Sequence, residues 1–157
     1  MSFKVSVICT VYNEENYVSK MINSFLNQDY EVNEIIVVDD GSDDNTYKII
    51  KDLSDKNNKI KALRLTTNVG KAKAQNAGFL NSTGDFIAII GGDDYASKKR
   101  ISTQINFLIN NNYDVCFTNL FLVDEYGNYI KKSKLYYSEE PLIKKDIFSL
   151  LKGSSFP

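Results

Sequence analysis

Two pairs of adjacent aspartates, each placed after an apolar run, are the residues of this 157-residue chain best suited to bind a charged ligand. Asp39 and Asp40 follow the first run directly, whereas two glycines separate the second run from Asp93 and Asp94. Carboxylates that lie side by side repel one another, and a divalent cation that carries a diphosphate would relieve that repulsion. Because parallel strands bind ligands beyond their carboxyl ends, we expect both pairs to belong to one site.

A third polar segment, residues 10–15, lies between the first predicted strand and the first predicted helix. It offers a hydroxyl, an aromatic ring, an amide and a carboxylate near a helix amino terminus, a set that suits a nucleotide base and its phosphates. These residues are Thr10, Tyr12, Asn13 and Glu14. The alternative is local: Asn13 would cap the helix, and Tyr12 would cover the edge of the sheet.

The aspartate pairs have local alternatives as well. Asp39 and Asp40 could accept hydrogen bonds from a ligand, bind a cation, or cap the turn formed by Gly41-Ser42. For the second pair we favour a functional interpretation, because Gly91-Gly92 removes side chains just before the carboxylates and leaves room for a close ligand. Lys71 follows a glycine turn at the head of a predicted helix, where it could reach a phosphate or remain solvated.

The elements that must position these residues alternate between strand and helix. Short apolar runs predict buried strands, and apolar residues at helical spacing predict the helices between them. This alternation predicts an α/β fold of nucleotide-binding type, with a mostly parallel, Rossmann-like sheet, helices on both faces and an antiparallel C-terminal edge. Ser42 or Asp44 would cap the second helix. The expected strands are 4–10, 34–39, 60–65, 86–90, 115–123 and 129–132, and the expected helices are 15–27, 46–53, 71–80, 98–109 and 142–151.

The composition excludes several classes of function. With 19 basic and 20 acidic residues, the chain has no overall charge that would attract nucleic acid or an anionic membrane. Because it has no histidine and only two cysteines, zinc sites and histidine acid-base chemistry are excluded, and any metal must be a hard cation bound by oxygen. Cys9 and Cys116 lie in apolar runs and are expected to be reduced core thiols. No apolar run is long enough to span a membrane, so we expect no transmembrane segment and a cytoplasmic location.

The length predicts one domain, residues 1–157, with a single core. After the helix expected over 142–151, residues 153–157 have the composition of a loop that leads toward another element. We therefore expect the domain to be truncated at its C-terminal end, or to be the first half of a longer protein.

Taken in order, these motifs resemble those of the family 2 glycosyltransferases of GT-A fold. The resemblance covers roughly residues 3–130, and its matching segments are Val5–Glu15, Glu34–Ser42, Asn68–Gly70, Asn76–Gly78 and Gly84–Ile87 with the following Asp93-Asp94. It implies an enzyme that transfers a sugar, with inversion, from a nucleotide-diphosphate sugar to an acceptor hydroxyl. The donor in this family is usually a UDP sugar.

The resemblance also implies roles for single residues. Thr10 and Tyr12 would line the base and ribose pocket, and Asp39 would accept a hydrogen bond from the uracil imide N–H. Asp93 would lie near the ribose, and Asp94 would bind the Mg²⁺ or Mn²⁺ that neutralises charge on the departing diphosphate. The rest of the expected donor-binding set is Asn13, Glu14, Asp40 and Lys71.

Two positions depart from the family's pattern. Gly91 stands where the acidic motif usually begins with an Asp, and Gln75 stands where an Arg is common. Lys71 or Lys73 could substitute for that cation. Inverting transfer also needs a carboxylate that takes the proton of the acceptor hydroxyl. The resemblance finds no match for it within the chain, so we expect the general base beyond Pro157.

The expected acceptor is a carbohydrate, a lipid-linked group or another hydroxyl compound, in the synthesis of cell-surface polysaccharide or another glycoconjugate. Such a protein would work in the cytoplasm, free or peripherally at the inner face of the membrane. Two alternatives stay open: a nucleotide-sugar-binding module without catalysis, and a phosphoacceptor receiver domain, which would place its acidic pair after the first strand and a third Asp after the third strand. Asp124, in a predicted turn, is expected to stabilise a hairpin.

Overall fold

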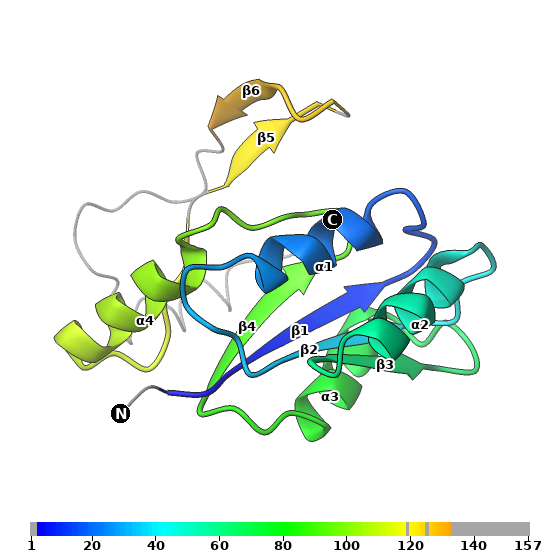
Figure 1. Ribbon diagram of the computed structural model, residues 1–157, viewed down its shortest axis with the longest axis horizontal. Helices are drawn as coiled ribbons and strands as arrows, with labels where there is room; N and C mark the ends of the chain where they lie inside the picture. The colour runs from blue at the N-terminus through cyan, green and yellow to red at the C-terminus, as the bar shows by residue number, and fades with distance from the viewer. Residues whose placement is uncertain (1–2, 119, 125, 133–157) are drawn as a thin grey trace, which may run out of the picture. The chain divides into compact units, whose positions relative to one another are not determined.

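The computed structural model describes residues 3–118, 120–124 and 126–132 (Figure 1). The chain divides after Asp114 into two compact units, which we describe separately. The first unit contains a four-stranded, fully parallel sheet with strand order β3-β2-β1-β4. Its strands are β1 (Val5–Val11), β2 (Glu34–Asp39), β3 (Ile60–Arg64) and β4 (Phe86–Gly91).

A helix follows each of these strands, as a parallel sheet requires, because the chain must cross back before the next strand can run in the same direction. The predicted α/β class is confirmed, and the predicted ends of these elements are correct to within one helical turn. The helices are α1 (Val18–Leu26), α2 (Thr46–Lys56), α3 (Lys71–Leu80) and α4 (Arg100–Asn111).

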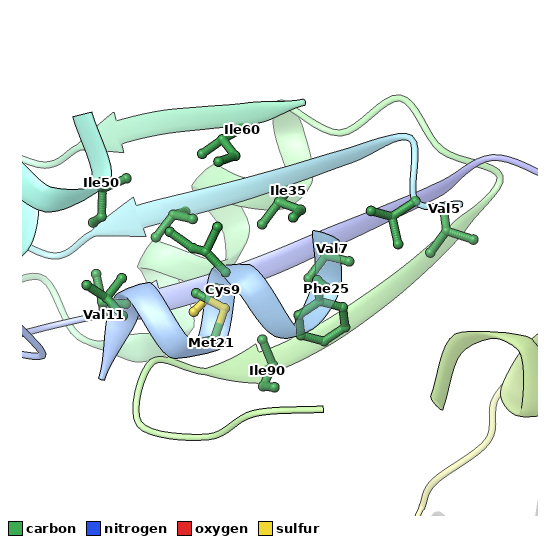
Figure 2. Packing of buried hydrophobic residues seen from close by; sticks show 14 of the residues in the cluster. Val5, Val7, Cys9, Val11, Met21, Phe25, Ile35, Ile50, Ile60 and Ile90 are labelled. Carbon is green, nitrogen blue, oxygen red and sulfur yellow. The ribbon is translucent and has the colours of Figure 1, made fainter. Parts of the chain in front are cut away.

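One face of the sheet carries the main hydrophobic core (Figure 2). β1 and β2 are buried along their whole length, which is why their sequences are mostly apolar and do not alternate regularly between apolar and polar residues. Side chains of α1, α2 and α4 belong to this core, and Met21 and Phe25 of α1 lie beside Cys9 and Val7 of β1. Burial of one such side chain stabilises the fold by about 1.5–3 kcal/mol. The core thus fixes the strands whose carboxyl ends carry the predicted site.

α3 covers the opposite face, where a smaller core cluster contains Ile36, Val38 and Ala74. Gly78 allows the helix to approach β1 closely, since a Cβ added there would lie 2.5 Å from Cγ2 of Ile8. The sheet is therefore covered by helices on both faces, as the sequence predicts.

α1 begins at Val18 and not at residue 15, where the sequence predicts its start. Asn13 has a left-handed backbone conformation with a φ of 56°, and a turn follows it. In that turn the carbonyl oxygen of Glu14 accepts hydrogen bonds of 3.0 Å from the N–H groups of Tyr17 and Val18. Asn13 therefore does not cap the helix, and the local alternative for this residue is wrong.

The second unit contains an antiparallel pair, β5 (Phe121–Val123) and β6 (Tyr129–Lys132), which forms a two-stranded sheet of its own. The strand predicted over 115–123 is correct only at its end, because residues 115–118 have no strand conformation. Cys116, in that stretch, is consequently half-buried, whereas Cys9 is a buried core thiol as expected.

Asp124 has the hairpin role that the sequence predicts. Its Oδ1 accepts hydrogen bonds from the N–H groups of Tyr126 and Asn128, at 3.0 and 2.8 Å. Hydrogen bonds from the Asn128 side chain and backbone hold the pKa of Asp124 below its usual range. The helix predicted over 142–151 lies outside the described residues. Among the helices that the structure describes, none has the length and apolar character needed to cross a membrane.

Candidate functional site

Asp39 is the last residue of β2 and is fully buried. Its Oδ1 accepts a hydrogen bond of 3.2 Å from the backbone N–H of Ser42. Its Oδ2 lies 3.3 Å from Nε of Arg64, close enough for an ion pair, but the alignment falls short of a hydrogen bond and no other described residue supplies one. A buried carboxylate oxygen without a hydrogen bond is costly, so Oδ2 is the atom here that most needs a donor from a ligand.

Arg64 is the residue of this region that sequence reasoning missed. It is the last residue of β3, and the parallel register places it directly beside Asp39. Its Nη2 donates a hydrogen bond of 2.9 Å to the carbonyl oxygen of Ser42, and its guanidinium carbon lies 4.9 Å from the centre of the Tyr47 ring. Aligning the two predicted strands in parallel would have placed Asp39 within one residue of Arg64, and that was the available signal.

Asp40 is buried beside Asp39 but is used differently. Its two carboxylate oxygens accept hydrogen bonds from the backbone N–H groups of Val69 and Gly70, at 2.8 and 2.9 Å. Gly70 has a φ of 89°, a conformation that favours glycine. Asp40 thus holds the loop between β3 and α3 against the end of β2, and its expected contact with a donor stays an untested prediction.

Hydrogen bonds between side chain and backbone join the loops that follow β1 and β2. Oδ1 of Asn13 accepts from the N–H of Asp43 at 3.0 Å, and Oγ of Ser42 accepts from the N–H of Asn13 at 2.9 Å. Oγ1 of Thr46 accepts from the N–H of Glu14 at 2.7 Å. The segment after β1 is therefore fixed by the loop after β2 and by the start of α2, in addition to the bond between Glu14 and the start of α1.

Thr10 and Tyr12, which were predicted to line the base and ribose pocket, differ in accessibility. Thr10 is buried within β1, whereas Tyr12, just beyond the end of that strand, is exposed over 42% of its surface. Neither residue expected to cap α2 is its N-cap, which is Asn45. Asp44, one residue earlier, still supports the start of the helix, because its Oδ1 accepts a hydrogen bond of 2.9 Å from the N–H of Thr46.

The turn after β4 carries Asp93 and Asp94, and both side chains are exposed. A Cβ added to Gly91 would lie 2.9 Å from Oδ1 of Asp93 and 3.4 Å from Oδ2 of Asp94, so both carboxylates fold back over the end of the strand. A Cβ added to Gly92 would lie 2.5 Å from Cγ1 of Val11. The expectation that both glycines leave room for a ligand is therefore wrong for Gly92, which packs against β1.

Carboxylates from two loops concentrate negative charge at this edge. Although Asp94 is an exposed residue, its carboxyl group is partly covered, and this partial burial, followed by the charge of Asp93, raises the pKa of Asp94. Burial and the charges of Asp93 and other nearby aspartates raise the pKa of Glu14. Burial also raises the pKa of the Cys9 thiol in β1, and the negative charges of Asp93, Glu14 and Asp94 raise it further. The three carboxylates thus act on one another and on the same strand end.

Two cations lie within electrostatic reach of these carboxylates. Lys71 and Arg100 both lower the pKa of Asp94, against the larger effects of burial and Asp93. Arg100 also donates a hydrogen bond of 2.9 Å from Nη2 to the carbonyl oxygen of Ile89. Lys71, the first residue of α3, is exposed and is therefore the cation better placed to meet a phosphate.

The carboxylates suit a cation that is shared with a ligand. Among the described residues, no three possible metal ligands stand together as a group that could hold an ion alone. Mg²⁺ is usually held by one or two carboxylates together with substrate phosphates and water. The raised pKa of Asp94 marks a carboxylate whose charge is poorly compensated, and a divalent cation would relieve that condition. The residues present therefore fit Mg²⁺ or Mn²⁺ bound together with a diphosphate.

The loop after Asp94 is attached to the end of α1 through Gln28. Nε2 of Gln28 donates to the carbonyl oxygen of Ser97 at 2.8 Å, and its Oε1 accepts from the N–H of Ile101 at 3.0 Å. Gln28 thus supplies a side-chain partner to the start of α4, whose own N-cap residue forms none. The loop that follows the acidic turn is held by the core of the first unit.

Comparison with known proteins assigns the chain to a family. Residues 6–156 match the family described as Glycosyl transferase family 2. The chain belongs to this family. It is 36% identical over 152 residues to an uncharacterized glycosyltransferase of Haemophilus influenzae, covering 97% of this chain and 58% of that protein. An uncharacterized glycosyltransferase of Methanocaldococcus jannaschii is 33% identical over 147 residues, which cover 92% of this chain and 51% of that protein. The chain thus spans little more than half the length of these relatives.

Solved structures of similar proteins support the same family and fold. The crystal structure of S. aureus TarS 1-349 in complex with UDP-GlcNAc is 34% identical, with a TM-score of 0.62 over 69% of this chain and 32% of TarS. A mannosyltransferase from Pyrobaculum calidifontis, at 24% identity and a TM-score of 0.64, shows the fold alone. The GT-A fold is therefore confirmed, and the receiver-domain alternative is set aside.

Proposed function

We propose that this chain forms the donor-binding part of a glycosyltransferase that transfers a sugar from a UDP sugar to an acceptor hydroxyl with inversion. The observation that carries the proposal is that two features lie where the parallel strands end: a buried carboxylate oxygen without a hydrogen bond, and a cluster of carboxylates. Oδ2 of Asp39 lacks a hydrogen bond, and Asp93 and Asp94 share a poorly compensated negative field. TarS, a relative in fold and sequence, has been crystallised with UDP and with UDP-GlcNAc, which supports a uridine nucleotide as the donor.

In this proposal the base is bound at the end of β2. Asp39 accepts a hydrogen bond from the uracil imide N–H, and this bond satisfies the oxygen that the fold leaves without one. Tyr12, an exposed residue, stacks on the base or ribose, and Thr10 lines the same pocket. Asn13 keeps this segment attached to the loop after β2 and so positions Tyr12.

The sugar diphosphate extends from the base toward β4. Asp93 lies on the ribose side, and Asp94 binds the cation, with Glu14 adding to the negative field that attracts it. When bound, Mg²⁺ or Mn²⁺ neutralises the charge that builds up on the leaving diphosphate. Lys71 meets the phosphate oxygens as a point charge in place of the Arg that is common in the family. These residues bind and orient the donor, so that its anomeric carbon is presented to an acceptor.

The acceptor is proposed to be a hydroxyl compound, either a carbohydrate or a lipid-linked group, in the synthesis of polysaccharide or glycoconjugate. Inversion requires that the hydroxyl attack from the side opposite the leaving diphosphate while a carboxylate removes its proton. None of the carboxylates described above is assigned to that proton transfer.

A thermal-shift comparison tests the proposal. UDP with Mn²⁺ is expected to raise the melting temperature, because binding at about 100 times Kd stabilises a protein by roughly 2.7 kcal/mol. UDP with a chelator is expected to give a much smaller shift, and uridine, which lacks the diphosphate, to give the same small shift with or without Mn²⁺. If UDP gives equal shifts with Mn²⁺ and with chelator, the cation has no part in donor binding, and no shift in either condition would refute the uridine donor.

A further inference from the structure

We propose that Arg64 fixes Asp39 as an acceptor of hydrogen bonds and thereby makes the site select nucleotides whose base offers an N–H donor. The inference rests on the proposed function, because it concerns the carboxylate that is proposed to meet the base. Arg64 is a positioning residue in this scheme: it acts on the base through Asp39.

Both carboxylate oxygens of Asp39 face donors that belong to the protein. The N–H of Ser42 donates to Oδ1, and Nε of Arg64 lies 3.3 Å from Oδ2. An amide in place of the carboxylate would turn an N–H₂ group toward one of these two donors. The carboxylate offers an acceptor oxygen to each of them.

The contact with Arg64 leaves part of Oδ2 unused. A carboxylate oxygen can accept two hydrogen bonds, and Nε of Arg64 is not aligned to form even one. Whatever reaches Oδ2 must therefore donate. Uracil presents N–H at its imide nitrogen, whereas cytosine presents a lone pair at the equivalent ring position and would leave two acceptors facing each other. A site that hydrogen-bonds a donor discriminates against an analogue without one, because the buried group is then unpaired.

Strand pairing and a hydrogen bond place Arg64 beside Asp39. Its position at the end of β3 is set by the parallel pairing with β2, and its Nη2 is fixed on the carbonyl oxygen of Ser42. The Tyr47 ring lies beneath the guanidinium. Since Asp39 is fully buried, a base reaches Oδ2 only where a neighbouring group yields. In this proposal the Arg64 side chain, which is 48% exposed, shifts its Nε away from Oδ2 when a base binds and keeps its bond to Ser42.

A purely structural ion pair would have the same contacts but a different consequence. It would stabilise the pairing of β2 with β3 without affecting which base binds. The ratio of the dissociation constants for CDP and UDP separates the two roles, because both nucleotides carry the same diphosphate and require the same cation.

The experiment measures that ratio by titration calorimetry with Mn²⁺ for the wild type, Arg64→Met, Arg64→Lys and the control Lys59→Met. Lys59 pairs with the exposed Glu31, so the control removes the same charge just before the same strand, away from Asp39. The wild type is expected to prefer UDP by about 10-fold to 100-fold, the range of one hydrogen bond to a charged group. Arg64→Met should bring the ratio close to 1, Arg64→Lys should keep part of the preference, and Lys59→Met should keep all of it.

Circular dichroism on the same samples reports whether each variant is folded. If Arg64→Met is unfolded, Arg64→Lys decides: a ratio below that of the wild type supports the proposal, and an equal ratio overturns it. A folded Arg64→Met that keeps the wild-type ratio overturns the role of Arg64 and leaves the proposed function intact. A wild type that binds UDP and CDP equally, or binds neither, refutes the uridine donor and this inference together.

Discussion

The first and last residues of β2 are both buried carboxylates, and the fold treats them in opposite ways. Glu34, at the amino end, accepts hydrogen bonds from Oγ of Ser6 at 2.6 Å and from N and Oγ1 of Thr83 at 2.7 and 2.9 Å. Its other oxygen lies 2.5 Å from Nζ of Lys61. Asp39, at the carboxyl end of the same strand, has one oxygen without any hydrogen bond from the described residues.

The two edges of the sheet at which the strands begin and end, its amino and carboxyl edges, differ in how well their carboxylates are compensated. Burial alone would raise the pKa of Glu34, but the hydrogen bonds from Lys61, Ser6 and Thr83 outweigh it and lower the pKa to about 2. At the opposite edge, burial and like charges raise the pKa values of Glu14 and Asp94. Charge at the amino edge thus contributes to folding, whereas charge at the carboxyl edge lacks compensation within the protein and is available to a ligand.

Replacing Glu34 should have the largest effect. Glu34→Gln removes the charge that Lys61 meets and turns an amide N–H₂ group toward a donor, so the free energy of unfolding is expected to fall by about 3 kcal/mol. Urea denaturation measures it. The matched control is Glu31→Gln, which removes an exposed ion pair with Lys59 and should change stability by less than about 1 kcal/mol. Equal losses in the two variants would contradict the contrast between buried and exposed charge.

The stability of the wild-type protein should also depend on the charge of Glu34 and should fall in acid. The pKa of Glu34 is lowered from 4.5 to about 2 on folding, so the native state holds fewer protons than the unfolded state between these values. Its contribution, about 3 kcal/mol, is fully present above pH 4.5 and is lost as the pH falls toward 2. The stability of Glu34→Gln should therefore approach that of the wild type as the pH falls through this range. If the stability difference between the wild type and Glu34→Gln stays constant over this pH range, Glu34 is not the group that causes the loss of stability in acid.

At the carboxyl edge, Asp94→Asn should affect binding and not folding. Loss of one charged ligand is expected to weaken Mn²⁺-dependent UDP binding by about 1.5–3 kcal/mol, while the melting temperature of the free protein stays the same or rises. Titration calorimetry with and without Mn²⁺ measures the first effect, and a thermal melt measures the second. Asp55→Asn, at an exposed aspartate on α2 that pairs with Lys51, is the control and should leave UDP binding unchanged. A large drop in melting temperature for Asp94→Asn would assign Asp94 to the fold.

The smallest effect is expected at Glu14. Glu14→Gln removes one of several carboxylates that repel each other, so it should stabilise the free protein by about 0.5 kcal/mol, the scale of a single exposed charge pair. The neighbouring Glu15 gives the contrast, because its Oε2 accepts hydrogen bonds from N and Nδ2 of Asn45, at 2.9 and 2.8 Å. Glu15→Gln should therefore destabilise. If the two variants shift the melting temperature in the same direction, repulsion among these carboxylates does not lower the stability of the free protein.

The sequence predicts the sheet and its helices, because buried parallel strands leave short apolar runs and amphipathic helices leave a periodic pattern. It does not predict which polar residues are already engaged within the protein. Asp39 and Asp40 are equivalent in sequence, yet the backbone N–H groups of Val69 and Gly70 engage Asp40 alone. These partners come from a loop distant in sequence, so only the folded chain distinguishes the two aspartates.

Other errors have the same physical origin. In the sequence, Gly92 suggests room for a ligand, but the position that its side chain would take is occupied by Val11 of β1. The strand expected over 115–123 rests on apolar residues alone, and only Phe121–Val123 finds a partner strand. Arg64 left no local signal, because its importance lies in the residue that the sheet places beside it.

The attachment of α1 to the loop after Asp94 constrains how the chain can vary in length. Besides the bonds of Gln28, Oγ of Ser24 accepts from the N–H of Ala96, and the N–H of Asp29 donates to the carbonyl oxygen of Lys98, both at 3.0 Å. The consecutive loop residues Ala96, Ser97 and Lys98 each form a hydrogen bond with a residue in or just after the last turn of α1. Inserting or deleting one loop residue would therefore shift the following residues away from their partners. Because residues 96–98 form these bonds through backbone groups, their side chains can be exchanged, whereas a change in the number of residues is expected to disrupt the attachment.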